Sequence, residues 1–147
     1  MIVDRNKTYL KTDREPRKWY IIDAKNQNLG RLSSQIAYFL IGKKNITYTP
    51  HMKNEINIII LNSKLIQITG NKKYQKTYKR HSGRPGGLKV ELFDKLQQKM
   101  PNKIIEHSIK GMLPKNTLSR QLFTQIKIYP NHIHPHSSQK PLLIKLN

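Results

Sequence analysis

The first half of the chain places short apolar runs on either side of one amphipathic segment. Residues 19–24 form a β-type run that ends in polar residues and predicts a buried strand. After a turn at residues 26–28, apolar side chains recur at helical spacing from Leu29 to Leu40, and Gly42 is expected to end that helix. A strand, a short turn and a helix in this order form the opening of a βαβ unit.

Residues 56–61 form a nearly continuous apolar run. Such a run is typical of a strand covered on both faces, so it indicates a parallel or mixed sheet with helices on each side. Residues 65–69 follow a polar break and predict a third strand. We therefore expect an α/β fold, built as a single three-layer domain with a parallel or mixed sheet and helices on both faces.

The second half of the chain carries the spacing of further helices. Val90, Phe93, Leu96 and Met100 predict one face of a helix that ends before Pro101. Proline is tolerated in the first turn of a helix, so the next helix is expected to begin there. The remaining predicted elements are a break at residues 111–116, a short helix bearing Leu118, Leu122 and Phe123, and a final strand at residues 126–129.

These elements fit a single domain of 147 residues with three parts. Residues 1–17 are polar and charged, and predict a basic N-terminal arm that gains order on a partner or stays loose. Residues 18–129 are expected to form the α/β core. Residues 130–147 are expected to form an ordered but irregular C-terminal extension.

The charge balance narrows the possible partners. The chain has 28 Lys and Arg against 8 Asp and Glu, which gives a formal net charge of +20. Such a chain attracts polyanions, and nucleic acid is the simplest permanent partner. A membrane surface is the competing partner, but no apolar stretch approaches the roughly 20 residues of a spanning helix, and no signal-peptide pattern is present. Cysteine is absent, which excludes disulfides and cysteine-ligated zinc.

The cations concentrate in a basic segment, residues 72–87, which has no acid between Lys72 and Arg84. Lysines and arginines neutralise phosphates, tyrosines and histidines stack or hydrogen-bond, and glycines let the backbone lie against RNA. The part from Asn71 to Lys79 is expected to be partly helical, and His81 to Gly87 a loop, although a merely solvated basic loop would show the same composition. The predicted RNA-binding residues are Lys72, Lys73, Tyr74, Lys76, Tyr78, Lys79, Arg80, His81, Ser82, Gly83, Arg84, Gly86 and Gly87, joined by Lys115 and Arg120 from a downstream cluster.

The sequence shows no complete set of catalytic or cofactor-binding residues. Asp23 alone ends a predicted strand where an α/β active site would lie, and it is interpreted as a turn or capping residue. The first turn has only Gly30 and lacks the dinucleotide glycine pattern. His132, His134 and His136 are interrupted by a proline, which favours polar contacts with RNA or a protein over a metal site. We predict a binder without cofactor or metal; a basic RNA-modifying enzyme and a free RNA-binding regulator are the alternatives.

The order of short motifs along the chain resembles the large-subunit ribosomal protein thirteen family, of the bacterial and organellar type. The matching segments span roughly positions 17–141 and are residues 19–24, 29–32, 48–51, 69–72, 81–83, 86–87, 111–114, Tyr129 and 134–139. Departures from the family pattern fall at Glu55-Ile56, Arg84-Pro85 and Ser119.

The resemblance implies a single α/β domain, with a sheet of about four strands, helices on both faces and terminal extensions. It implies no enzymatic activity. It also implies binding to large-subunit ribosomal RNA, a role early in subunit assembly, and contacts with neighbouring ribosomal proteins. Residues 72–87 correspond to the RNA-contacting region of that family. Heavy use of Lys, Ile and Asn resembles plastid-encoded members. We therefore expect a plastid (chloroplast) ribosome, with the cytoplasm of an AT-rich bacterium as the alternative.

Overall fold

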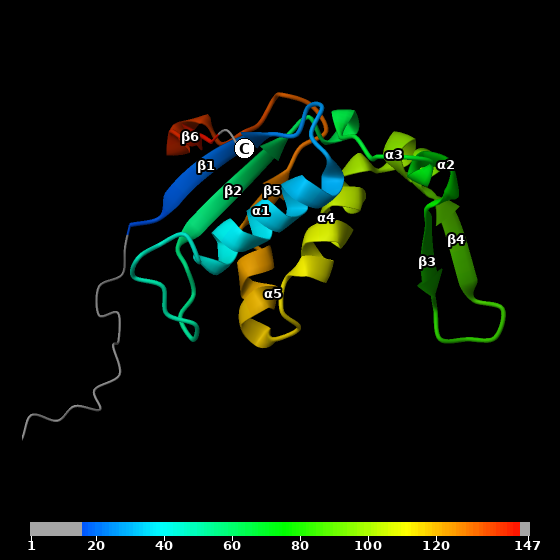
Figure 1. Cartoon of the computed structure of the whole chain (residues 1–147), viewed down its shortest axis with the longest axis horizontal. Coiled ribbons are helices and arrows are strands. Elements are labelled where there is room, and N and C mark those ends of the chain that lie inside the picture. Colours follow the sequence, from blue (N-terminus) through cyan, green and yellow to red (C-terminus); the bar gives the residue numbers. More distant parts are fainter. Residues whose placement is uncertain (1–15, 145–147) are drawn as a thin grey trace, which may run out of the picture.

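The computed structural model describes residues 16–144, and its main sheet has four parallel strands. β1 (Lys18–Asp23) pairs with β2 (Ile56–Leu61), and β2 pairs with β5 (Ile126–Ile128). On its other side β1 pairs with β6 (Leu142–Leu143), which gives the strand order β5-β2-β1-β6 (Figure 1). The predicted α/β class, the parallel sheet and the strands at 19–24 and 56–61 are therefore confirmed.

Helix α1 (Leu29–Ile41) connects β1 to β2 and ends as predicted. Its buried stripe includes Leu29, Leu32, Ile36 and Leu40, because these positions share one face at 3.6 residues per turn. Gly42 caps the helix with φ 84° and donates its N–H to the carbonyls of the last turn. Only glycine adopts this left-handed conformation at little cost, so Gly42 ends the helix and turns the chain back toward β2.

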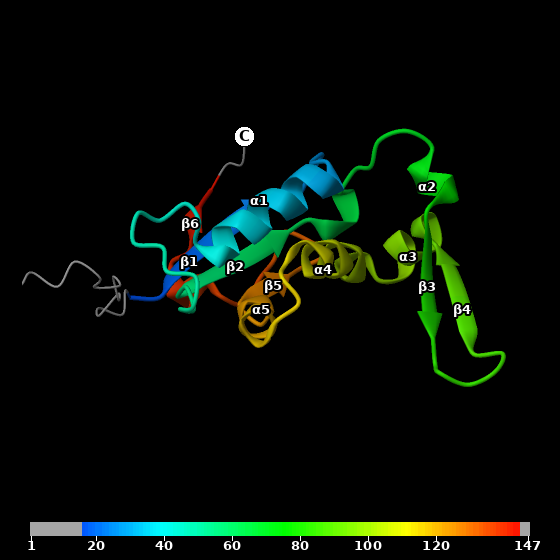
Figure 2. The same ribbon diagram turned by 60° about the horizontal axis from the view of Figure 1, so that its bottom comes forward.

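Two helices cover one face of the sheet. Figures 1 and 2 show α1 and α4 (Pro101–Met112) side by side on this face. Alternate strand residues point to opposite faces, so one set of side chains from β1 and β2 enters this core. The core is formed by Ile22, Ile58 and Ile60 from the strands, Leu32, Ile36 and Leu40 from α1, and Ile104, Ile105 and Ile109 from α4.

The segment that follows β5 contacts the second face of the sheet. The ring of Trp19 in β1 lies 5.3 Å from that of His136, between ring centroids. This segment contains the 3-10 helix η2 (Ser137–Gln139) and leads into β6. Ile59, which alternates with the core residues of β2, is fully buried. Helices α1 and α4 therefore cover one face, and a largely irregular segment with one helical turn contacts the other.

The third strand predicted at residues 65–69 is wrong. Asn62 adopts a left-handed conformation with φ 58°, and the 3-10 helix η1 (Ser63–Leu65) follows it. Beyond that turn, Gln67 forms only an isolated bridge to Asn28. The edge of β2 that a following strand would use pairs with β5, which comes much later in the chain.

The predicted helix face from Val90 to Met100 is half wrong. Val90 lies in β4 (Leu88–Leu92), which forms an antiparallel hairpin with β3 (Thr77–His81). Only the second half is helical, as α3 (Phe93–Lys99). Leu88, Val90 and Leu92 alternate with period two, and the strand that contains them pairs with β3. The prediction of part-helix for residues 71–79 is confirmed for α2 (Lys72–Gln75), but β3 begins at Thr77 and includes His81, which was expected to begin the loop.

The remaining elements follow the sequence pattern with small shifts. Pro101 lies in the first turn of α4, as expected, but that helix runs on to Met112 instead of breaking at residue 111. The short helix is α5 (Thr117–Phe123). The chain after Pro130 is mostly irregular, but it also supplies strand β6, which the sequence pattern did not predict.

The division of the chain into three parts remains a prediction. The partition into an arm, a core at 18–129 and an extension at 130–147 has no independent test. Most of the N-terminal arm, residues 1–15, and the end of the chain, residues 145–147, lie outside the described residues. Within residues 16–144, no helix combines the length and the apolar character that a membrane crossing requires.

Candidate nucleic-acid interface

The basic segment forms an exposed projection that we call the basic hairpin, residues 72–92. It comprises α2, β3, a six-residue loop and β4, and its strands pair from Thr77 opposite Leu92 to His81 opposite Leu88. Figures 1 and 2 show it extending away from the main sheet. Of the predicted RNA-binding residues in this segment, all are exposed except Tyr78 and Gly87, which are half-buried. The predicted cations are therefore accessible to a large anionic partner.

Two lysines of the projection already have partners within the protein. The ammonium of Lys73 lies 3.6 Å from the carboxylate of Asp94 and 5.9 Å from the centroid of the Tyr74 ring. The ammonium of Lys76 lies 5.4 Å from the centroid of the Tyr78 ring. These contacts leave Tyr74 72% exposed, so its ring is available for stacking. Lys72, Lys79 and Arg84 have no such partner among the described residues.

The register of the hairpin places two cations directly opposite each other. Arg80 in β3 pairs with Lys89 in β4, and both are exposed. Like charges at directly opposed positions destabilise a two-stranded sheet. The neighbouring pair, Tyr78 and Glu91, shares the same face and supplies one acid. An anion bound over Arg80 and Lys89 would relieve their repulsion, so this face suits a phosphate.

The loop between the strands is held by its own hydrogen bonds. The Gly83 N–H donates to Nδ1 of His81 at 2.9 Å, the Gly87 N–H donates to the Arg84 carbonyl at 3.0 Å, and the Ser82 N–H donates to the Gly87 carbonyl at 3.3 Å. Gly83 and Gly86 have positive φ values and open space where a side chain would begin. A side chain at Gly87 would instead meet the Arg84 carbonyl at 2.9 Å, so Gly87 shapes the loop from within.

Tyr78 anchors the projection to the helical layer. Its ring centroid lies 5.4 Å from that of His107 in α4, with the rings at 84°, and 6.5 Å from that of Phe93 in α3. Burial raises the pKa of the Tyr78 phenol above its ordinary value of 10.0, because desolvation disfavours the phenolate. The ring predicted to stack on a base is therefore already packed within the protein.

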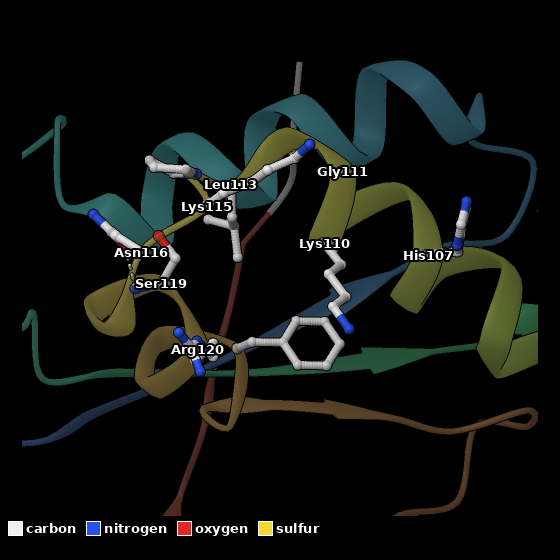
Figure 3. A pocket seen from close by; sticks show the side chains of 10 residues that line it. His107, Lys110, Gly111, Leu113, Lys115, Asn116, Ser119 and Arg120 are labelled. Atoms are coloured by element: carbon white, nitrogen blue, oxygen red, sulfur yellow. Dashed lines mark hydrogen bonds between the residues drawn. The ribbon is translucent and has the colours of Figure 1, made fainter. Parts of the chain in front are cut away.

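Lys115 and Arg120 lie apart from the hairpin loop, at a pocket between α4 and α5. Figure 3 shows this pocket, whose volume is about 640 Å³. Asn116 caps α5 by accepting a hydrogen bond from the Ser119 N–H at 2.8 Å, which fixes the loop between the two helices. The pocket is lined by His107, Lys110, Gly111, Leu113, Pro114, Lys115, Asn116, Ser119, Arg120 and Phe123.

His107 links the pocket that contains Lys115 and Arg120 to the basic hairpin. His107 lines the pocket and also contacts Tyr78 at the base of the hairpin. The pocket and the basic hairpin are therefore neighbours, although their residues are distant in the sequence. This arrangement joins the two predicted clusters through a contact between β3 and α4.

Sequence reasoning missed two cations of this surface, Lys89 and Lys110. Lys89 was overlooked because residues 88–92 were interpreted as part of a helix, which concealed its position opposite Arg80. An alternating apolar pattern at Leu88, Val90 and Leu92 was the available signal. Lys110 lines the pocket from α4, and only the spatial approach of α5 makes this visible.

Asp23 and His136, which were considered for catalysis and metal binding, have structural partners. One carboxylate oxygen of Asp23 accepts from the Lys25 N–H at 2.9 Å and from the side-chain amide of Asn62 at 2.8 Å, which confirms its interpretation as a turn residue. His136 contacts Trp19 and lies 2.8 Å from the Tyr129 hydroxyl through Nε2. Across residues 16–144, no group of three or more histidine and carboxylate side chains could hold a metal ion.

Comparison with known proteins identifies several sequences that are similar to this chain. The sequence model of the family described as ribosomal protein L13 matches residues 17–135. The chain is 60% identical to "Large ribosomal subunit protein uL13c" of Gracilaria tenuistipitata var. liui over 95% of this chain and 97% of that protein. It is 54% identical to "Large ribosomal subunit protein uL13" of Microchaete diplosiphon over 96% and 94% of the two chains.

These relatives indicate a ribosome of plastid or bacterial type, as expected from the resemblance. Their family consists of structural proteins without enzymatic activity, which confirms the prediction that the chain is not an enzyme. The matched region includes all of β1 to β5, the basic hairpin and the pocket. The chain belongs to the ribosomal protein L13 family.

Proposed function

We propose that this chain is a structural constituent of the large ribosomal subunit that binds large-subunit ribosomal RNA through the basic hairpin. The main support for this proposal is that Arg80 and Lys89 lie opposite each other on an exposed projection with few acidic residues nearby. Exposed lysines and arginines release counterions when they neutralise phosphates, which supplies affinity without reading the sequence of the RNA.

The shape of the projection also suits RNA. Tyr74 presents an exposed ring among lysines, and Gly83 and Gly86 leave open space around the loop backbone. An aromatic ring can stack on an unpaired base, and a loop without bulky side chains can approach a phosphate closely. We also propose that the chain acts early in assembly of the subunit, as the family resemblance implies. Because its relatives are named for the large subunit, neighbouring ribosomal proteins are its expected protein partners.

The binding test compares two triple variants at several salt concentrations. Lys72, Lys79 and Arg84 have no side-chain partner among the described residues, so Lys72→Ala, Lys79→Ala and Arg84→Ala remove charge without breaking an internal contact. The control replaces Lys43, Lys44 and Lys53 by Ala in the loop after α1, which lies at the opposite end of the molecule (Figure 1). Purified large-subunit ribosomal RNA is the ligand, and filter binding gives the affinity.

The hairpin variant is expected to bind more weakly and to flatten the log–log salt dependence by roughly 0.7–0.9 for each lost phosphate contact. The control variant should retain most of the affinity. Equal losses in both variants would show that net charge alone governs binding, and an unchanged slope in the hairpin variant would place the RNA face elsewhere.

A second experiment tests the ribosomal role in cells. Lysate is sedimented before and after a high-salt wash, and the chain is followed by mass spectrometry. Near one-to-one recovery with the large subunit after the wash is expected. Release by the wash would favour a free RNA-binding regulator, the remaining alternative.

A further inference from the structure

The pocket between α4 and α5 combines a cationic rim with an apolar wall. Lys110, Lys115 and Arg120 are exposed at the rim, and none of them forms an ion pair with a carboxylate among residues 16–144. No acidic residue lines the pocket. In Figure 3, Lys110 extends from α4 toward α5, which carries Arg120. A rim of unpaired cations favours an anionic group at this position.

An inorganic anion alone would not match this pocket, because part of its wall is apolar. Leu113 is buried, Phe123 is half-buried, and Pro114 adds a third apolar surface. The volume of about 640 Å³ falls within the roughly 300–1,000 Å³ typical of pockets for small molecules. A group with a flat apolar body and a phosphate would match both surfaces. A nucleotide has this composition, because its base stacks on apolar and aromatic side chains while its phosphate pairs with cations.

We propose that this pocket holds a single unstacked nucleotide of ribosomal RNA, with its base against the apolar wall and its phosphate at Lys115 and Arg120. The inference rests on the proposed RNA binding and adds a second contact, different in kind from the hairpin. RNA is the favoured source because His107 joins the pocket to Tyr78 at the base of the basic hairpin. A strand held by the hairpin therefore passes near the mouth of the pocket.

Gly111 offers a steric test that leaves every charge in place. It lies in α4, lines the pocket, and has open space where a Cβ atom would be built. Gly111→Leu therefore adds a four-carbon side chain at the pocket, and leucine is a better helix former than glycine, so the helix should persist. Gly111→Ala is the matched control, because one methyl group leaves most of the volume free.

The first readout is affinity for large-subunit ribosomal RNA, with the fold of each variant checked by circular dichroism. Gly111→Leu is expected to weaken binding about 5- to 150-fold, the range of one lost base stack. Gly111→Ala should bind within about twofold of the parent chain. Parent-like affinity in a folded Gly111→Leu protein would overturn the inference.

The second readout is photocrosslinking of the complex, with mapping of the protein residue joined to RNA. We expect a crosslink at the pocket that is lost in Arg120→Glu and retained in Lys103→Glu, an exposed control on α4 outside the pocket. The crosslinking experiment tests the inference even if Gly111→Leu fails to fold. Absence of a pocket crosslink in the parent complex would overturn the inference.

Adenosine monophosphate and inorganic phosphate serve as separate probes of the isolated protein. Adenosine monophosphate that binds tightly and is not displaced by ribosomal RNA would make a free nucleotide the ligand, which contradicts an RNA source. If inorganic phosphate binds with the same affinity as adenosine monophosphate, the apolar wall does not contribute to binding. If the hairpin variant loses RNA affinity while Gly111→Leu does not, the proposed function stands and only the pocket inference fails.

Discussion

The rings of Tyr78 in β3 and His107 in α4 pack edge to face, with centroids 5.4 Å apart and an angle of 84° between the planes. Tyr78 is the only side chain of β3 that is not exposed. The position of the basic hairpin relative to the core therefore depends on this ring and on its second neighbour, Phe93.

Tyr78→Ala is expected to lower the free energy of unfolding by about 1–3 kcal/mol. Truncating a fully buried aromatic residue costs about 3–5 kcal/mol, and Tyr78 is only half-buried. Urea unfolding measures the change. Tyr78→Phe keeps the ring and should lie within about 0.5 kcal/mol of the parent chain. An equal loss in both variants would mean that the hydroxyl, and not the packing of the ring, anchors the hairpin.

The same burial predicts a stability change at alkaline pH. The pKa of Tyr78 is raised in the folded state because desolvation disfavours its charged form. Above the ordinary pKa of 10.0 the unfolded chain releases this proton first, so stability present at lower pH is lost as pH rises through the folded pKa. Tyr78→Phe should lose less stability over this range. Nuclear magnetic resonance titration of labelled tyrosine rings measures the pKa directly, and a Tyr78 value at or below 10.0 would contradict the assignment.

Lys89→Glu is expected to stabilise the hairpin and to weaken RNA binding. It places opposite charges at the Arg80 and Lys89 pair, where opposed like charges now repel, and the gain should be a few tenths of a kcal/mol. Amide hydrogen exchange in β3 and β4 reports the stability, and filter binding reports the affinity. Lys89→Gln should be intermediate in both. Faster exchange in Lys89→Glu would show that the repulsion is negligible.

Asn116→Ala is expected to destabilise the chain by about 0.5–2 kcal/mol, because it removes the side chain that accepts from the Ser119 N–H. Thermal unfolding measures this loss. Asn116→Asp retains an acceptor and should restore most of the stability. If the aspartate variant is as unstable as the alanine variant, the amide group itself, and not N-capping, explains the effect.

Sequence reasoning succeeded where one local pattern determined one element. The continuous apolar run of residues 56–61 became β2, and the helical spacing closed by Gly42 became α1. In both cases the buried positions are local in sequence, so periodicity alone assigns the face. Asp23 was also understood correctly, because a polar residue at the end of a strand commonly bonds to the backbone of the following turn.

It failed where distant pairing decided between two patterns. Val90, Phe93 and Leu96 have spacing that fits a helix, but Leu88, Val90 and Leu92 also fit a strand. Pairing with β3 selected the strand for the first part of this segment. Residues 65–69 have strand composition, yet the edge of β2 beyond them is occupied by β5. Neither outcome can be read from a window of ten residues.

The candidate interface shows the same division. The exposed cations of residues 72–84 were predictable from composition, since a run with no acid cannot be buried. The packing of Tyr78 was not, because it depends on His107 in a helix that follows the hairpin. Likewise, only the three-dimensional fold shows that Lys110, Lys115 and Arg120 surround one pocket.

The pairing of β1 with β6 has a consequence for how the chain reaches its native state. Tyr20 is opposite Leu142, so nearly the whole described chain separates the two partners. Such non-local contacts slow folding, because a long loop must close before they form. Until β6 arrives, one edge of β1 has unpaired backbone groups that can recruit a strand from another chain. A nascent or truncated chain is therefore the form most exposed to aggregation, and a chaperone that shields β1 would act during this interval.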